Sequence, residues 1–134
     1  MRPKNSKTRQ RALANGYRSG LEEKVSKELD KLGVKYGYEN IKINYTQPPK
    51  YRTYTPDFTL PNGIIIETKG RFTSEDRQKH KWIKDQQPKL DIRFVFSNSR
   101  QKLYKGAKSS YADWCIKNGF LYADKMIPQE WLDE

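Results

Sequence analysis

Apolar residues recur at helical spacing just after Ser19. The stripe consists of Leu21, Val25, Leu29 and Leu32. Intervals of three and four residues place these side chains on one face, which predicts an amphipathic helix. Ser19 is a favoured N-cap residue, Glu22 three positions on would complete a capping box, and Gly33 suits the end of the helix. We therefore expect a helix between Ser19 and Gly33.

Strand patterns fill the next part of the chain. The alternation of polar and apolar residues over 34–46 changes parity near Glu39–Asn40, which indicates a bulge or a break. Two consecutive prolines make residues 47–52 a connector or an edge strand, because proline has no N–H to donate to a sheet. Two further strands are expected over 54–60 and 63–69, the second with consecutive isoleucines typical of a buried strand.

The C-terminal half alternates helices and strands. The expected elements are a helix over 73–87, a strand over 91–97, a helix over 109–119, and a tail with a short strand and a turn that carries Trp131. Thr73 or Ser74 caps the helix over 73–87, and Ser110 with Asp113 forms a capping box for the helix over 109–119. The order helix, three strands, helix, strand, helix predicts one α/β domain over residues 18–134, with a mixed, largely antiparallel central sheet flanked by helices.

The turn at 60–63 fixes which residues face each other in the hairpin of strands 54–60 and 63–69. Its sequence, Leu-Pro-Asn-Gly, suits a type I turn followed by a left-handed residue, which is a three-residue loop. Counting back from this turn brings Asp57 opposite Glu67, with Cβ atoms roughly 5 Å apart, and puts Lys69 on the same face. A two-residue Asn-Gly loop would instead send Asp57 to the other face.

Opposed carboxylates repel each other unless a positive charge lies between them. Lys69 alone could supply that charge, which would make the cluster an ordinary set of ion pairs. A divalent cation is the functional alternative, since Asp57, Glu67 and the backbone carbonyl of Thr68 offer hard oxygen ligands. Such a cation activates water and offsets charge on a phosphorane-like transition state, with Lys69 orienting the water or stabilising the charge.

The charge balance points to a polyanionic partner. Twenty-seven Lys and Arg residues against sixteen Asp and Glu residues give a net charge of +11. Nucleic acid is the commonest partner of so basic a small domain, although a merely solvated basic surface is the alternative. We expect residues 1–17 to be a flexible basic arm. The residues expected to contact DNA phosphates are Arg2, Lys4, Lys7, Arg9, Arg11, Arg18, Arg71, Arg77, Lys81, Arg100 and Lys105.

Several classes of protein are disfavoured by the composition. A single cysteine, Cys115, excludes an internal disulfide and fits a reducing, cytoplasmic compartment; it is expected to be a small buried side chain. A single histidine, His80, stands among basic residues and is expected to be solvated or to face phosphate. No long apolar run indicates a membrane span.

Four stretches carry a resemblance to a known family. Pro56-Asp57, nine intervening residues and Glu67-Thr68-Lys69 resemble the PD-(D/E)xK nuclease signature. This hairpin, the helix RSGLEEKVSKEL and the segments DIRFVFSNSRQKLYKG and ADKMIPQEWL resemble, in the same order, the phage endonuclease I family, which comprises the Holliday-junction resolvases of T-odd bacteriophages. The similarity runs from about Tyr17 to the C-terminus.

The resemblance implies a magnesium- or manganese-dependent endonuclease that cuts branched DNA, four-way junctions above all, without a nucleotide cofactor or a membrane. Each active site would hold two metal ions: Asp57 is shared, Glu67 and the Thr68 carbonyl bind the first, and Glu22 binds the second. Lys69 matches the catalytic lysine. The family forms a strand-exchanged homodimer, which here implies a bridging segment near residues 44–53 and a Glu22 contributed by the partner.

Two other functions stay open on the residues alone. One is a nuclease with the same core that cuts linear duplex, as restriction or repair enzymes do. The other is a non-catalytic, basic DNA-binding protein in which the acidic hairpin is only an ion-pair cluster. Glu22 is likewise open, because read locally it is a capping-box residue and not a ligand.

Overall fold

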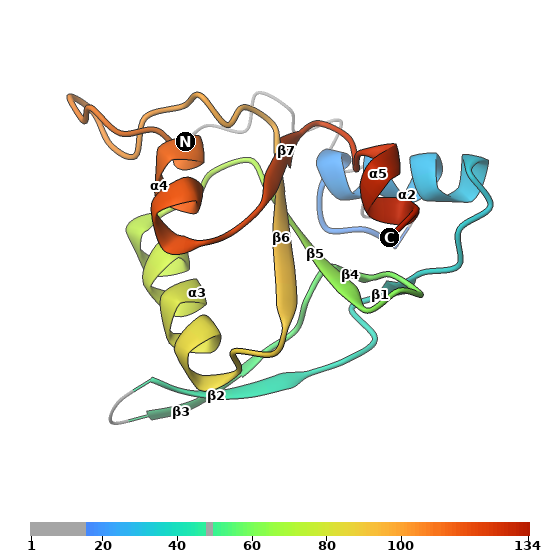
Figure 1. The fold of residues 1–134 in the computed structure, drawn as a ribbon, viewed down its shortest axis with the longest axis horizontal. Coiled ribbons are helices and arrows are strands. Elements are labelled where there is room, and N and C mark those ends of the chain that lie inside the picture. Colours follow the sequence, from blue (N-terminus) through green and yellow to red (C-terminus); the bar gives the residue numbers. More distant parts are fainter. Residues whose placement is uncertain (1–15, 48–49) are drawn as a thin grey trace.

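The computed structural model describes residues 16–47 and 50–134, which form one α/β unit (Figure 1). In chain order the elements are α2 (Gly20–Lys31), β1 (Gly37–Tyr38), β2 (Ile43–Gln47), β3 (Lys50–Tyr54), β4 (Phe58–Thr59), β5 (Ile64–Lys69), α3 (Ser74–Gln86), β6 (Asp91–Phe96), α4 (Tyr111–Asn118), β7 (Tyr122–Asp124) and α5 (Gln129–Leu132). Most of the expected basic arm, residues 1–15, lies outside the described residues. Tyr17 is described, and its ring packs edge-on against Tyr38 with centroids 4.6 Å apart.

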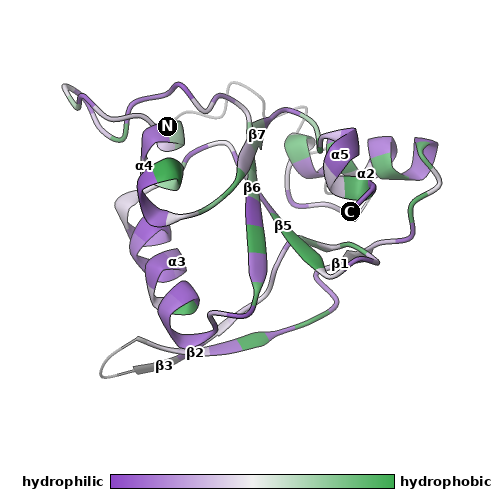
Figure 2. Cartoon of the chain, in the orientation of Figure 1, coloured by the Kyte–Doolittle hydropathy of each residue, from purple (hydrophilic) through white to green (hydrophobic). Residues whose placement is uncertain are grey.

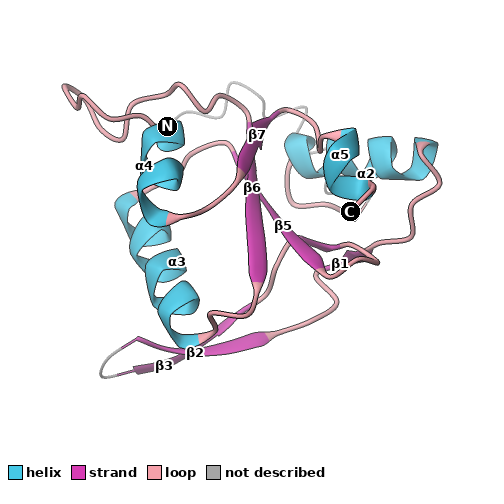
Figure 3. Ribbon diagram, viewed as in Figure 1, coloured by secondary structure: helices cyan, strands magenta, loops and turns pink. Residues whose placement is uncertain are grey.

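The strands form two sheets (Figure 3). The larger has the order β1-β4-β5-β6-β7, with antiparallel pairing from β1 to β5 and parallel pairing from β5 to β7. The parallel part arises because α3 and α4 serve as crossover connections, which a short hairpin turn cannot replace. β2 and β3 pair only with each other, in a separate antiparallel hairpin. The mixed α/β architecture expected from the sequence is confirmed.

Helices cover both faces of the larger sheet. α3 and α4 lie on one side, and α2 and α5 on the other (Figure 1). Ile65, Phe94 and Phe96 join the core under α3 and α4, whereas Ile64 and Ile66 join the core under α2 and α5. The consecutive isoleucines follow from this arrangement, because alternate residues of a central strand face opposite cores. Figure 2 shows a hydrophobic run on β5 and a largely hydrophilic α3.

The hairpin of β4 and β5 has the register expected from its turn. Phe58 pairs with Ile66 and Thr59 with Ile65, which excludes the two-residue loop. Gly63 closes the turn with a φ of +91°, a conformation that glycine adopts without strain. β4 is shorter than expected, since Asp57 already precedes its first residue. The carboxylate therefore lies at the mouth of the hairpin and not within the ladder.

Helix caps follow the sequence signals, with one partial exception. Thr73 caps α3 and Ser110 caps α4, each within a complete capping box. In α2 the Ser19 side chain accepts from the backbone N–H of Glu22, but the Glu22 carboxylate accepts from Arg18 and not from Ser19. Only half of the expected box is formed, because the Glu22 side chain is used elsewhere.

The expected environment of His80 is wrong. Its side chain is fully buried between Tyr54, Phe94 and Phe120, all in edge-to-face contact. His80 lies three residues before the buried Ile83, so that both occupy the inner face of α3 while the basic neighbours occupy the outer face. Cys115 is buried on α4, as expected. Among the described residues, no helix is long and apolar enough to cross a membrane.

Candidate active site

Asp57 lies at the centre of the candidate site, immediately before β4. Its side chain is buried, and its Oδ2 accepts hydrogen bonds from both the backbone N–H and the hydroxyl of Thr68, at 2.9 and 2.8 Å. Burial raises the pKa of Asp57, while the two Thr68 hydrogen bonds oppose the shift. Thr68 therefore fixes one oxygen of the carboxylate and orients the group across the mouth of the hairpin.

Glu67 lies on β5, next to Thr68, and its side chain is buried as well. The Tyr54 hydroxyl donates to its Oε1 at 2.7 Å, and its Oε2 is 3.5 Å from Nζ of Lys69. Burial and the negative charge of Asp57 raise the pKa of Glu67 to about 7, although Lys69 and Tyr54 oppose the shift. Glu67 and Lys69 thus lie together on β5, whereas the Asp57 carboxylate is hydrogen-bonded to Thr68 and acts on Glu67 through its charge.

Glu22 reaches the same place from the first turn of α2. Its Oε1 accepts from the backbone N–H of Arg18 at 3.0 Å and from the Tyr38 hydroxyl. Burial, followed by the charge of Asp57, raises the pKa of Glu22 to about 7. The helix thus directs a carboxylate towards the hairpin, 35 residues away in sequence.

Glu39 is a further carboxylate at the site, and the sequence analysis missed it. One carboxylate oxygen each from Glu22, Glu39 and Asp57 lies within 4.8 Å of the others. Glu39 adopts a left-handed conformation with φ +48°, and its backbone N–H donates to the Asp57 carbonyl. The only sequence signal was the break in alternation at Glu39–Asn40. An unusual backbone conformation of a residue other than glycine often marks a functional position.

Lys69 has a second acidic partner, Asp76, in the first turn of α3. Its Nζ donates to Oδ1 of Asp76 at 3.3 Å. Burial acts to lower the pKa of Lys69, but the charges of Glu67 and Asp76 outweigh it and the pKa is raised. Lys69 is therefore a cation and a hydrogen-bond donor at neutral pH, and it has no lone pair with which to act as a base.

The side chains present suit a hard divalent cation. The cluster contributes carboxylate oxygens and no sulfur or imidazole, which favours Mg²⁺ or Mn²⁺ over softer metals. Buried carboxylates with raised pKa values are groups that lack sufficient positive charge nearby, and a bound cation would supply it. Tyr38, Tyr54 and Thr68 each hold one of these carboxylates by a hydrogen bond, as the supporting residues of metal sites do.

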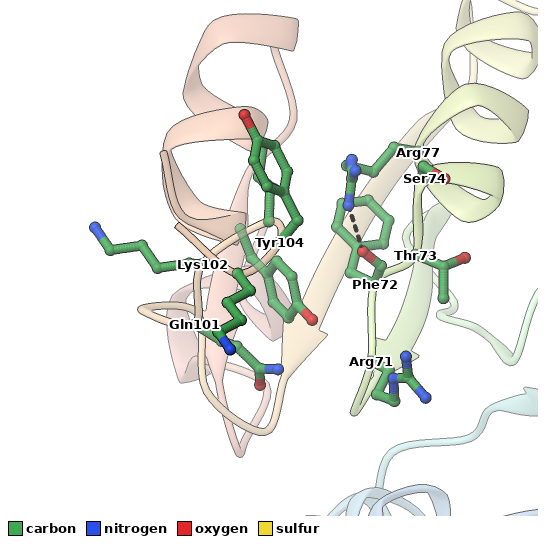
Figure 4. Close-up of a pocket in the computed structure, with 11 residues that line it drawn as sticks. Arg71, Phe72, Thr73, Ser74, Arg77, Gln101, Lys102 and Tyr104 are labelled. Atoms are coloured by element: carbon green, nitrogen blue, oxygen red, sulfur yellow. Dashed lines mark hydrogen bonds between the residues drawn. The ribbon is translucent and has the colours of Figure 1, made fainter. Parts of the chain in front are cut away.

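The basic residues proposed from the sequence occupy several places. Arg18 forms an ion pair with Glu39 at 2.9 Å, at the edge of the acidic cluster. Lys81 on α3 and Arg100 after β6 are exposed. The other three line one cavity, whose walls face each other in Figure 4: Arg71, Arg77 and Lys105. The candidate residues of the N-terminal arm, from Arg2 to Arg11, lie outside the described residues.

Comparison with known proteins identifies close relatives. The model of the family "Phage endonuclease I" matches residues 4–134. Endonuclease I of Escherichia phage T7 is 57% identical over 118 residues, which cover 88% of this chain and 79% of the relative. Endodeoxyribonuclease 1 of Enterobacteria phage T3 is 59% identical over 112 residues, which cover 84% of this chain and 74% of the relative.

Proposed function

Because the chain belongs to the phage endonuclease I family, and is therefore a nuclease, we propose that it is a structure-selective DNA endonuclease that resolves four-way junctions and other branched DNA. The observation that carries this proposal is the cluster of Glu22, Glu39 and Asp57, whose carboxylate oxygens lie within 4.8 Å of one another. The charge of Asp57 also raises the pKa of Glu67, whose Oε2 lies 3.5 Å from Nζ of Lys69. The net charge of +11 supplies affinity for phosphates, and the acidic cluster supplies the chemistry.

The proposed site binds two divalent cations, Mg²⁺ or Mn²⁺. In this proposal Asp57 would bind both cations, Glu67 and the Thr68 carbonyl oxygen would bind one, and Glu22 would bind the other. When bound, these cations would lower the pKa of a water molecule and offset the charge that develops on the phosphate. Glu39 is a further candidate ligand, because its carboxylate lies within 4.8 Å of those of Glu22 and Asp57.

Hydrolysis adds water across one P–O ester bond of the DNA backbone. The water oxygen forms a bond to phosphorus, the ester bond breaks, the water gives up a proton to solvent and the leaving oxygen takes one up. The protonated Nζ of Lys69 would donate a hydrogen bond to the attacking water or to a phosphate oxygen. Asp76 and Glu67 hold that ammonium group at the site, at 3.3 and 3.5 Å.

We further propose a homodimer in which the segment around residues 44–53 crosses between subunits. β2 and β3 support this arrangement, because their hairpin pairs with no strand of the larger sheet. Opening it would keep every pairing of the larger sheet, with β1 of one subunit pairing with β4 of the other. Glu22, which precedes the hairpin, would then serve the Asp57 of the other subunit, and two symmetric sites could cut two strands of one junction.

Subunit mixing tests the exchange. Glu22→Gln and Asp57→Asn should each be inactive alone. In an exchanged heterodimer, one site receives both substitutions and the other receives neither, so that mixing should restore about half of the activity per heterodimer. Without exchange, each site carries one substitution, and the mixture stays inactive.

The activity itself is tested with end-labelled DNA in Mg²⁺, in Mn²⁺ and in EDTA. A four-way junction is compared with a linear duplex of the same arm sequence. We expect paired, metal-dependent cuts near the branch point, with the duplex largely spared. Glu67→Gln should abolish cutting while preserving junction binding, whereas Glu130→Gln, an exposed substitution on α5, should change neither.

Other outcomes lead to different functions. Equal cutting of junction and duplex would keep the nuclease and reject branch selectivity. Junction binding without cutting in either metal would reject the catalytic assignment and leave an ion-paired hairpin in a DNA-binding protein.

A further inference from the structure

A basic groove lies beyond the C-terminal end of β5. It has a volume of about 680 Å³. One wall is formed by residues 71–77, from the connection after β5 and the start of α3, and the other by residues 101–105, from the loop between β6 and α4 (Figure 4). Both walls follow the carboxyl ends of parallel strands, where α/β sheets commonly form binding sites.

The groove is lined by four cations and by no carboxylate. Nη1 of Arg77 donates to the Phe72 carbonyl, and Nζ of Lys102 donates to the Lys108 carbonyl, so that both side chains are held in place. Arg71 and Lys105 are exposed, and no side-chain hydrogen bond or ion pair joins either of them to another described residue. Their charges are available to a phosphate backbone.

Tyr104 is a large aromatic side chain held out in solvent on this wall, 66% exposed. Its loop is ordered by backbone hydrogen bonds from Leu103 to Ser109 and from Tyr111 to Gln101, at 3.0 and 2.9 Å. These bonds join the two ends of the loop that carries the ring. An exposed aromatic ring among cations is the arrangement with which proteins bind unpaired nucleotides, by base stacking and phosphate contacts together.

The groove adjoins the candidate active site. Lys69 pairs with Asp76, and Asp76 in turn caps the same helix end as Thr73, a residue of the groove wall. Arg71 follows Lys69 by two residues. The groove is therefore a neighbour of the place where a phosphate would meet Lys69.

We propose that this groove binds an unpaired segment of the cut strand, with phosphates on Arg71 and Lys105 and a base stacked on Tyr104. The inference rests on the proposed nuclease function and adds a source of selectivity to it. Fully paired duplex keeps its bases stacked on each other, whereas a branch point or a flap presents bases with a free face. Tyr104 thereby favours branched DNA that exposes unpaired nucleotides over fully paired linear duplex.

The test is a binding cycle in EDTA with full-length protein and a flap substrate. Single abasic sites replace each of the nucleotides next to the branch in turn. Tyr104→Ala should weaken binding of intact flap DNA by about 5- to 150-fold, the range of one base–aromatic stack. An abasic site at one of these positions should weaken binding by the wild-type protein to a similar extent, and it should leave binding by Tyr104→Ala unchanged. Tyr104→Phe should bind as wild type does.

Matched substitutions separate the groove from general surface effects. Ile116→Ala removes an exposed hydrophobic side chain of α4 outside the groove and should leave binding unchanged. Arg71→Ala and Lys105→Ala should each lower the salt dependence of binding by about one ion, whereas Lys117→Ala, on the exposed face of α4, should not.

Equal losses from every abasic site in wild type and Tyr104→Ala would overturn the proposal. The cycle requires no cutting, so its failure is distinct from failure of the proposed function, which the cleavage assay with metal reports.

Discussion

The hydroxyl of Tyr54 donates a 2.7 Å hydrogen bond to Oε1 of Glu67, and both side chains are buried. Tyr54 ends β3, and Glu67 belongs to β5, so the bond joins the peripheral hairpin to the larger sheet at the acidic cluster. The hydrogen bond engages one oxygen of the Glu67 carboxylate, and the other oxygen, Oε2, lies 3.5 Å from Nζ of Lys69. Tyr54 is therefore a positioning residue for Glu67.

Removal of this hydroxyl should alter the titration of Glu67. The bond lowers the pKa of Glu67, so Tyr54→Phe should raise it further and move the acidic limb of the cleavage–pH profile to higher pH. The unpaired Oε1 should also reduce stability by about 1 to 3 kcal/mol. Junction binding in EDTA should be unchanged.

The control for this variant is Tyr45→Phe. Tyr45 is buried in the same aromatic core, and no hydrogen bond of its hydroxyl is recorded among the described residues. It should keep the wild-type pH profile. An unshifted profile in Tyr54→Phe would show that the hydroxyl only fills space.

The raised pKa of Glu67 also predicts how the metal-free protein responds to pH. The pKa of Glu67 is about 7 in the folded protein against an ordinary value of 4.5. Glu67 therefore contributes its full stabilisation of the folded protein below pH 4.5, and this contribution is lost as the pH rises through 7. Glu67→Gln lacks this loss. In EDTA the stability advantage of Glu67→Gln over wild type should be near zero at pH 4.5 and reach about 3 kcal/mol at pH 8.

Mg²⁺ should reverse this difference, because a cation binds the ionised carboxylate. Thermal unfolding at pH 8 should shift upwards with Mg²⁺ in wild type and much less in Glu67→Gln, and at pH 4.5 neither protein should respond. Equal Mg²⁺ shifts in both proteins at pH 8 would remove Glu67 from the metal site.

Substitution of Glu39 tests whether this carboxylate binds the cation or only lies next to the residues that do. If its carboxylate shares the cation with Glu22 and Asp57, Glu39→Gln should raise the Mn²⁺ concentration for half-maximal cutting by about tenfold. The rate at saturating Mn²⁺ should fall little. Arg18→Ala, which removes the ion-pair partner of Glu39, should instead leave the Mn²⁺ requirement unchanged or lower. If Glu39→Gln and Arg18→Ala changed the Mn²⁺ requirement equally, Glu39 would serve only as the ion-pair partner of Arg18.

The parts of this site that were predictable from sequence are those set by local rules. The turn at 60–63 fixes the register of its hairpin, and this register brings Asp57 to the end of β5 that carries Glu67, Thr68 and Lys69. Glu22 required the family resemblance, because its spacing from Ser19 equally describes a helix cap. Caps, turns and alternation each depend on a few neighbouring residues, so a single sequence reports them.

The unpredicted parts depend on contacts between distant segments. Glu39 reaches the cluster through a left-handed backbone, which no turn signal announced. Tyr54 meets Glu67 only once the two sheets are packed. His80 was misplaced because basic neighbours suggested exposure, whereas its alignment with Ile83 decides which face is buried. Position on a helix face outweighs the polarity of adjacent residues.

His80 yields a final prediction, about stability alone. Neither ring nitrogen has a hydrogen-bond partner among the described residues, and burial, with Lys69 and Lys79 nearby, keeps the pKa of His80 well below 6.5. The unfolded chain protonates this histidine below pH 6.5 and the folded protein does not. Wild type should therefore lose about 1.4 kcal/mol per pH unit below pH 6.5 relative to a variant without the imidazole.

His80→Phe and His80→Leu test this expectation by urea unfolding at pH 7.5 and pH 5. The two substitutions pack differently and will differ from each other in absolute stability, but both should gain about 2 kcal/mol on wild type between the two pH values. The pH dependence of the stability difference reports the protonation of His80 and not its packing, because the other titrating groups contribute equally to variant and wild type. A constant difference from wild type at both pH values would mean that the buried imidazole binds its proton in the folded state as readily as in the unfolded one.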